Sequence, residues 1–126
     1  MTDDLVQWLG EQLDEDERIA RAATAGPWTQ SGIGEYGWGV AFSVPGAGVE
    51  ANDSDQGRAD ADFIAAQDPA RVLREIDAKR ELLVWLVRKD DWALDNDLWT
   101  WDSDDALLLL ALPYADRPGY REEWKP

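Results

Sequence analysis

The sequence predicts an α+β fold, and changes in hydrophobic period along the chain are the basis of that prediction. Residues 3–23 have apolar side chains every three or four positions, which is the spacing of an amphipathic helix. Between Trp28 and Asn52 the period falls to two, as in a strand with one buried face. From residue 59 onward the helical period returns. We therefore expect an N-terminal helix, a small antiparallel sheet of two or three strands and further helices, all within one domain of residues 1–126.

The N-terminal helix is expected to end before Gly26-Pro27, because these residues stop helices. Its apolar stripe is interrupted by two polar residues, Gln12 and Asp16. One turn of the same helix is acidic on all sides. Its carboxylates must be solvated, paired with bases of the chain, or used to bind a basic partner. The acidic residues of this turn are Asp14, Glu15, Asp16 and Glu17.

The sheet is expected to consist of a hairpin and one further strand. Residues 38–44 alternate between large apolar and small side chains, the turn-forming run 45–48 follows, and 49–51 resume the alternation. Trp28 to Gln30 adds the third strand. No helix with Lys and Ser or Thr follows the glycine-rich segments, so a phosphate-binding loop is not predicted. The polar stretch 52–57 lacks the acid spacing of a calcium loop and is expected to be a turn.

A pair of helices is expected around Asp68-Pro69. Asp can cap a helix, and Pro suits its first position because no amide donor is needed there. The short helix, Asp60 to Gln67, should place Phe63 and Ile64 in the core. In the long helix after the junction, the apolar arc widens near the end through Leu82, Val84, Trp85 and Leu86. This helix is also the basic element of the chain, with Arg71, Arg74, Lys79, Arg80, Arg88 and Lys89.

The C-terminal helix is expected to begin at Ser103, which can cap it, with acids in its first turn that favour the helix dipole. The stretch from Leu107 to Leu112 is apolar on all sides. This helix should therefore be buried, or lie at the subunit contact of a homodimer. Tyr120 and Trp124 in the tail are expected to fold back as packing anchors.

The composition limits the chemistry of the protein. A net charge of −15, from 27 acids and 12 bases, repels nucleic acid and anionic membranes and attracts basic partners. The chain has neither Cys nor His, which excludes disulfides, thiol nucleophiles, thiolate zinc sites and histidine bases. We expect no cofactor and no metal. The N-terminus lacks a signal region and no apolar run is long enough to span a bilayer, so we expect a cytoplasmic protein.

Residues 90–105 combine seven Asp with interleaved Trp and Leu, a composition suited to a surface with apolar anchors and a charged rim. Alternation would place Trp99 and Trp101 on one face of an extended segment, where they could stack on a sugar or a base. The more common explanation of such a stretch, and the one expected here, is a loop held to the core by its Trp residues. The candidate binding residues of the chain are Asp14, Glu15, Asp16, Glu17, Asp90, Asp91, Asp95, Asp97, Trp99 and Trp101.

Five stretches carry a resemblance to known proteins: GPW at 26–28, ADFIA at 61–65, DPARVLREIDAKR at 68–80, LALPYAD at 110–116 and YREEW at 120–124. They resemble an uncharacterised family of short actinobacterial and actinophage proteins and, more distantly, lambda Ea22-like phage proteins. The resemblance covers most of the chain and implies a phage-related context without an assigned activity. Family members often have His near the Asp-Pro junction and in the tail, where this chain has Gln67 and Arg117.

On these grounds we expect a non-enzymatic accessory protein of a phage or its host that binds a basic or nucleic-acid-binding protein through its acidic, Trp-bearing surface. In a sharper form, the carboxylates mimic nucleic acid and occupy a basic channel of the target. Two alternatives stay open. One is a sugar or nucleotide binder that stacks its ligand on Trp99 and Trp101. The other is a magnesium-dependent hydrolase that uses acids between Asp90 and Asp97.

A homodimer through the C-terminal helix can be tested by replacing Leu109 with Lys. If the dimer forms through this helix, the variant should dissociate, because the contact would bury the new charge. Light scattering measures the solution mass. An unchanged mass in a folded variant would count against this contact.

Overall fold

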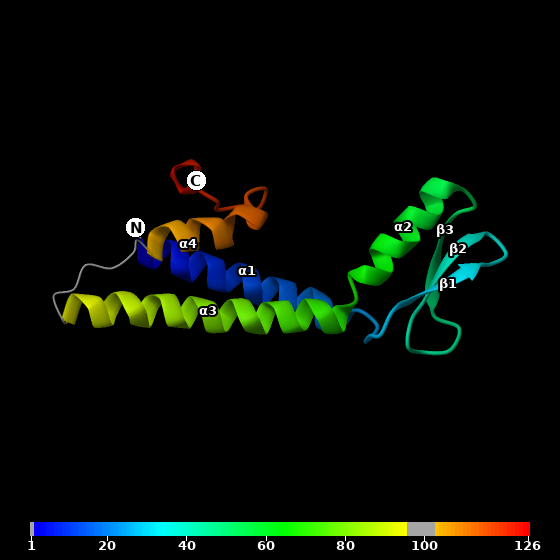
Figure 1. The fold of residues 1–126 in the computed structure, drawn as a ribbon, viewed down its shortest axis with the longest axis horizontal. Helices are drawn as coiled ribbons and strands as arrows, with labels where there is room; N and C mark the ends of the chain where they lie inside the picture. Colours follow the sequence, from blue (N-terminus) through cyan, green and yellow to red (C-terminus); the bar gives the residue numbers. More distant parts are fainter. Residues whose placement is uncertain (1, 96–102) are drawn as a thin grey trace. The chain divides into compact units, whose positions relative to one another are not determined.

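Figure 1 shows the computed structural model of the chain, which describes residues 2–95 and 103–126. The chain divides into two compact units. The helical unit comprises residues 1–16 and 76–126, and the sheet unit comprises residues 17–75. The predicted α+β class is confirmed, because an N-terminal helix, a three-stranded antiparallel sheet and a C-terminal helix are present. That the chain forms a single domain remains a prediction.

Two long helices contribute residues to both units. Helix α1 spans Thr2–Ala22, as its periodicity predicted. Helix α3 spans Pro69–Asp95, and its predicted start is confirmed: Asp68 Oδ1 accepts a hydrogen bond from the Ala70 amide at 3.2 Å. A proline at the first helical position loses no hydrogen bond, so the Asp-Pro pair begins the helix at this point.

The end of α3 corrects the sequence analysis, which expected a loop from Asp90 onward. The helix continues to Asp95, so Asp90, Asp91 and Asp95 lie on helical backbone. Neither Gly nor Pro occurs in this stretch, and nothing in it stops a helix that is already formed. Residues 96–102 lie outside the described part of the chain.

The sheet has the order β1-β2-β3, with strands β1 (Thr29–Ile33), β2 (Gly37–Ala41) and β3 (Gly48–Asn52). The predicted hairpin is formed by β2 and β3, and the predicted third strand is β1. On the central strand, Val40 pairs with Gln30 on one side and with Val49 on the other, and it is 2% exposed. This face of the sheet is the buried one.

Helix α2 (Asp55–Ala66) lies against the sheet and covers this buried face (Figure 1). Small residues allow the close approach. A Cβ added to Gly57 would lie 1.7 Å from the carbonyl oxygen of Asn52, and Ala61 is completely buried. Any larger side chain at Gly57 would push the start of the helix away from the end of β3.

Two expectations about this region were wrong. The helix begins at Asp55 instead of Asp60, because the Ser54 hydroxyl oxygen caps it by accepting a hydrogen bond from the Gly57 amide at 2.9 Å. Phe63, expected in the core, is 67% exposed. The face that α2 turns to the sheet is the one with Gly57 and Ala61, so Phe63 is left in solvent.

The helical unit has its own apolar core, built by α1, α3, α4 (Ser103–Ala111) and the tail. The tail contains two short 3-10 turns, η1 (Leu112–Tyr114) and η2 (Glu122–Trp124). As predicted, the apolar stripe of α1 is buried from Leu5 to Leu13, whereas Ile19 farther along the helix is 51% exposed. The core side chains are Leu5, Trp8, Leu9 and Leu13 of α1, Ile76, Leu83 and Leu86 of α3, Leu107 and Ala111 of α4, and Tyr114 and Trp124 of the tail.

The tail is held to α1 by an aromatic cluster, which confirms the predicted anchors. The Trp8 ring lies 5.3 Å from the Trp124 ring and 5.6 Å from the Tyr120 ring, centroid to centroid. The Trp8 Nε1 also donates a hydrogen bond to the Pro118 carbonyl at 3.1 Å. Gly119 follows in a left-handed conformation, with φ of 89°, and a Cβ there would lie 2.7 Å from the Trp8 indole nitrogen. Only glycine satisfies both conditions.

Replacing Trp124 with Ala should destabilise the helical unit by about 3–5 kcal/mol, because it removes a fully buried indole from the cluster. Leu109→Ala is the matched control, because Leu109 lies in the same unit but is 59% exposed, and its loss should cost less than about 1 kcal/mol. Urea unfolding followed by circular dichroism measures both. Equal costs would show that the tail does not anchor the unit.

Candidate functional site

Most carboxylates of the predicted acidic turn are paired with arginines of the same chain. Asp14 accepts a hydrogen bond from Arg80 at 2.7 Å, and Glu17 pairs with Arg21 at 3.4 Å. Asp16 forms an ion pair with Arg117. Glu15 lies on the same turn and is half-buried. Whether any of these carboxylates also binds a partner remains a prediction.

Arg117 explains why the apolar stripe of α1 is interrupted. Besides its ion pair with Asp16, its Nη1 donates to the main-chain oxygen and to the Oε1 of Gln12, both at 3.4 Å. Its guanidinium carbon also lies 4.7 Å from the centre of the Tyr114 ring, and Lys79 Nζ donates to the hydroxyl oxygen of that tyrosine at 3.3 Å. The two polar residues in the stripe, Gln12 and Asp16, thus both bind Arg117 of the tail.

The second predicted group of binding residues, between Asp90 and Trp101, lies only partly within the described residues. Asp90, Asp91 and Asp95 occupy the last turns of α3. Asp97, Trp99 and Trp101 lie outside the described residues. The proposed stacking platform and the carboxylate hydrolase therefore remain predictions.

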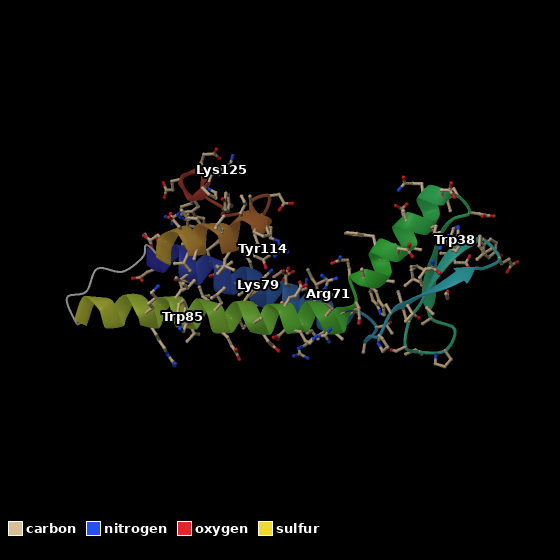
Figure 2. All side chains as sticks on the ribbon, viewed as in Figure 1. Trp38, Arg71, Lys79, Trp85, Tyr114 and Lys125 are labelled. Atoms are coloured by element: carbon tan, nitrogen blue, oxygen red, sulfur yellow. The ribbon has the colours of Figure 1, made fainter. Side chains whose placement is uncertain are left out.

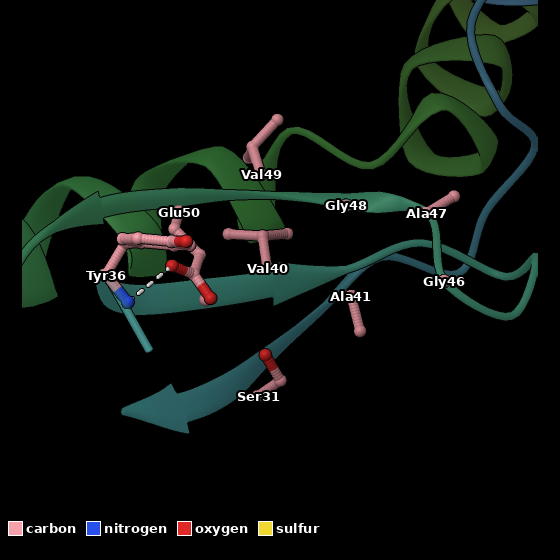
Figure 3. A pocket seen from close by; sticks show the side chains of 10 residues that line it. Ser31, Tyr36, Val40, Ala41, Gly46, Ala47, Gly48, Val49 and Glu50 are labelled. Atoms are coloured by element: carbon pink, nitrogen blue, oxygen red, sulfur yellow. Dashed lines mark hydrogen bonds between the residues drawn. The ribbon is translucent and has the colours of Figure 1, made fainter. Parts of the chain in front are cut away.

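A hollow of about 590 Å³ opens on the sheet face opposite α2 (Figure 3). Side chains alternate along a strand, so the residues next to Val40 and Val49 point away from α2. These positions are Gly39, Ala41 and Glu50, with Gly48 before Val49. Apart from Glu50, the floor of the hollow is therefore made of very small residues.

An irregularity in β1 directs a hydroxyl toward the same face. The register with β2 shifts between Gln30 and Gly32, which is the signature of a bulge at Ser31. A Cβ on Gly39 would lie 2.5 Å from Ser31 Oγ, so the two residues share this face. Gln30 supports the bulge from the other side, because its Oε1 accepts a hydrogen bond from the Gly32 amide at 2.7 Å.

One end of the hollow combines an aromatic ring with a carboxylate. Tyr36 is 77% exposed, and Glu50 Oε2 accepts a hydrogen bond from the Tyr36 amide at 2.9 Å (Figure 3). This bond fixes the Glu50 carboxylate beside the β1–β2 turn and leaves its charge exposed to solvent. Neither residue was among those predicted from the sequence to bind a partner. The signal was present, because the strand period places Glu50 on the face opposite to Val49 and Ala51.

A second exposed surface lies on α3 in the helical unit, and we call it the α3 face. Leu82, Val84 and Trp85 are 42%, 48% and 56% exposed, and a shallow hollow of about 410 Å³ lies beside Val84 and Trp85. Figure 2 labels Trp85 on this helix. Lys89 Nζ lies 5.2 Å from the centre of the Trp85 ring. The sequence analysis had noted that the apolar arc widens here.

Other chemistry finds less support in the part of the chain that the structure describes. Among the side chains that the structure describes, those of residues 3–89 and 104–126, no group of three acids is placed to hold a metal ion. Within residues 2–95 and 103–126, no helix is both long enough and apolar enough to cross a membrane.

In the tail, Glu122 accepts a hydrogen bond from Lys125 at 2.7 Å and raises the pKa of that lysine above its ordinary value.

Comparison with known proteins gives one match. A model of a family of unknown function, DUF6221, matches residues 2–126. The chain belongs to the DUF6221 family. No curated protein and no solved structure is significantly similar to it. Membership confirms the expectation of an uncharacterised family but assigns no activity, so function has to be argued from the surfaces described above.

The contact of Arg117 with Asp16 predicts unequal roles for two neighbouring acids. Asp16→Asn should destabilise the fold by about 1–3 kcal/mol, because the pair is only 30% and 21% exposed. Asp14→Asn removes the same charge from a side chain that is 75% exposed and should cost less than about 1 kcal/mol. Urea unfolding of both variants measures the difference. Equal values would mean that Arg117 does not anchor the tail through Asp16.

Proposed function

We propose that the protein acts without chemistry of its own and binds a basic segment of a partner protein in the hollow of the sheet unit. The observation that carries this proposal is the exposed Tyr36 ring beside the Glu50 carboxylate at the end of that hollow. This end of the hollow is acidic and aromatic, but none of its residues is among the binding residues predicted from the sequence.

The chemistry of this end suits an arginine or a lysine. A cation can lie over the face of a tyrosine ring while its N–H groups donate to a nearby carboxylate. Arginine fits best, because its planar guanidinium can stack and form hydrogen bonds at the same time. Glu50 is already oriented by the Tyr36 amide, so little conformational freedom is lost on binding.

The floor of the hollow allows an extended chain to approach the sheet. Gly39, Ala41 and Gly48 place almost no side-chain bulk over the strands, and Ser31 offers a hydroxyl for hydrogen bonding. The volume of about 590 Å³ falls in the range of about 300–1,000 Å³ that is usual for small-ligand sites. It therefore accommodates one or two side chains of a partner instead of a folded element.

Charge supports a basic partner over longer distances. The net charge of −15 draws basic proteins toward the chain and makes their association sensitive to salt. In the finer form of the proposal, the partner is a DNA- or RNA-binding protein and the acids compete with nucleic acid for its basic site, as an accessory protein of a phage or its host in the host cytoplasm would do. Other exposed acids of the sheet unit that could contribute are Glu35, Asp53 and Asp55.

The proposal predicts that Glu50→Gln weakens binding of a penta-arginine peptide at least about fivefold, because glutamine keeps the hydrogen-bond acceptor but loses the charge. Tyr36→Ala should weaken it similarly by removing the stacking face. The measurement is an NMR titration of the ¹⁵N-labelled full chain, in which the amides of Tyr36, Gly39 and Gly48 should shift.

Asp60→Asn is the matched control. It removes one exposed charge from the same unit, but on α2, which covers the other face of the sheet. Binding should then change less than about twofold, since only long-range attraction is lost. If Glu50→Gln and Asp60→Asn weakened binding equally, the peptide would be held by net charge alone and the hollow would not be a site. If the hollow is a site, immobilised wild-type chain should retain partners from a nuclease-treated bacterial lysate that Glu50→Gln does not retain, when both are eluted with a salt gradient.

A further inference from the structure

On the α3 face, exposed apolar side chains lie next to charged side chains for which the described side chains provide no ion pair. Val84 and Trp85 are about half exposed. Glu81 and Arg88 flank them and line the same shallow hollow. Within residues 3–89 and 104–126, whose side chains the structure describes, neither Glu81 nor Arg88 forms an ion pair or a hydrogen bond with another side chain. Exposed apolar area with a polar rim commonly marks a contact with another molecule.

Two charges of this face, Glu81 and Arg88, have opposite signs and lie symmetrically about its apolar centre. Glu81, Trp85 and Arg88 follow each other at intervals of four and three residues, so they share one side of the helix. The midpoint between Val84 and Trp85 lies three and a half residues from Glu81 and equally far from Arg88. At 1.5 Å per residue, each charge is about 5 Å along the axis from that midpoint.

We propose that the α3 face binds a second copy of this chain, with the two α3 helices antiparallel and a twofold axis at the Val84–Trp85 midpoint. In this arrangement Glu81 of one copy lies opposite Arg88 of the other, and the pair occurs twice. Val84 of each copy lies opposite Trp85 of the other, so the exposed apolar area of both copies is buried together.

Both the orientation and the choice of partner follow from the charges. A parallel pair would place Glu81 against Glu81 and Arg88 against Arg88, and like charges in contact oppose association. A dimer with twofold symmetry requires a surface that is complementary to itself, and the order acid, aromatic, base on one helix face meets this requirement when one copy is reversed. The net charge of −15 opposes association of two copies, so the attraction must come from such local pairing.

Charge reversal tests the arrangement. Wild-type chain should reach twice its 14.2 kDa mass in light scattering as concentration rises. Glu81→Arg and Arg88→Glu should each raise the dissociation constant of the dimer at least about tenfold, because each places two like-charged pairs in contact. An equimolar mixture of the two variants should form a heterodimer, since position 81 of each copy then faces the opposite charge at position 88 of the other. The double variant, Glu81→Arg with Arg88→Glu, should dimerise again by itself.

Controls separate this contact from others. Circular dichroism should show that both single variants keep the wild-type helix content, since both positions are exposed. Leu109→Lys should leave the dimer intact, because it changes α4 and not the α3 face. Glu50→Gln should also leave the mass unchanged, so failure of the hollow as a binding site and failure of the dimer are distinguishable.

Three results would overturn the proposal. The first is a wild-type chain that stays monomeric up to its solubility limit. The second is a pair of single variants that dissociate but do not recover when mixed, which would indicate a contact of different geometry or a different partner protein. The third is dissociation by Leu109→Lys with no effect of the α3 variants, which would assign the dimer to the C-terminal helix.

Discussion

The helical unit depends on the contact of the C-terminal tail with α1. The Trp8 ring packs against the rings of Trp124 and Tyr120, and its Nε1 donates a hydrogen bond to the Pro118 carbonyl. Farther along α1, Asp16 forms an ion pair with Arg117 of the tail. These contacts cover apolar side chains of α1 that would otherwise be exposed to solvent. They join residues more than a hundred positions apart in the sequence. The interaction thus combines apolar burial with a partly buried ion pair.

This packing changes the interpretation of the net charge. An excess of acids over bases suggested surfaces made for basic partners. Several of the most concentrated acids instead bind arginines of the same chain, as Asp14 and Asp16 do. The charges of functional interest are those that the fold leaves without such partners and places next to uncovered apolar or aromatic groups. Glu50 beside Tyr36 and Glu81 beside Trp85 both meet this description.

The two proposed surfaces lie on different units and have complementary consequences. A dimer formed through α3 would carry two hollows, and a partner with repeated basic segments could engage both. Such bivalent binding raises the overall affinity without any new contact, provided that the spacing of the segments allows simultaneous engagement. A DNA- or RNA-binding target that is itself a symmetric oligomer would offer such a repeat.

The sequence by itself determined what depends on local period and on turn chemistry. It was sufficient for the α+β class, the bounds of α1, the start of α3 at Pro69 and the aromatic anchors of the tail, because each of these is encoded within a few neighbouring residues. Only the tertiary structure decided which face of each element is covered. Phe63 is exposed because Gly57 and Ala61 allow α2 to approach the sheet more closely, and Glu50 is a candidate binding residue because a bulge and three small residues leave the opposite face hollow. Such choices depend on packing between segments distant in the chain, which the period of a single segment does not record.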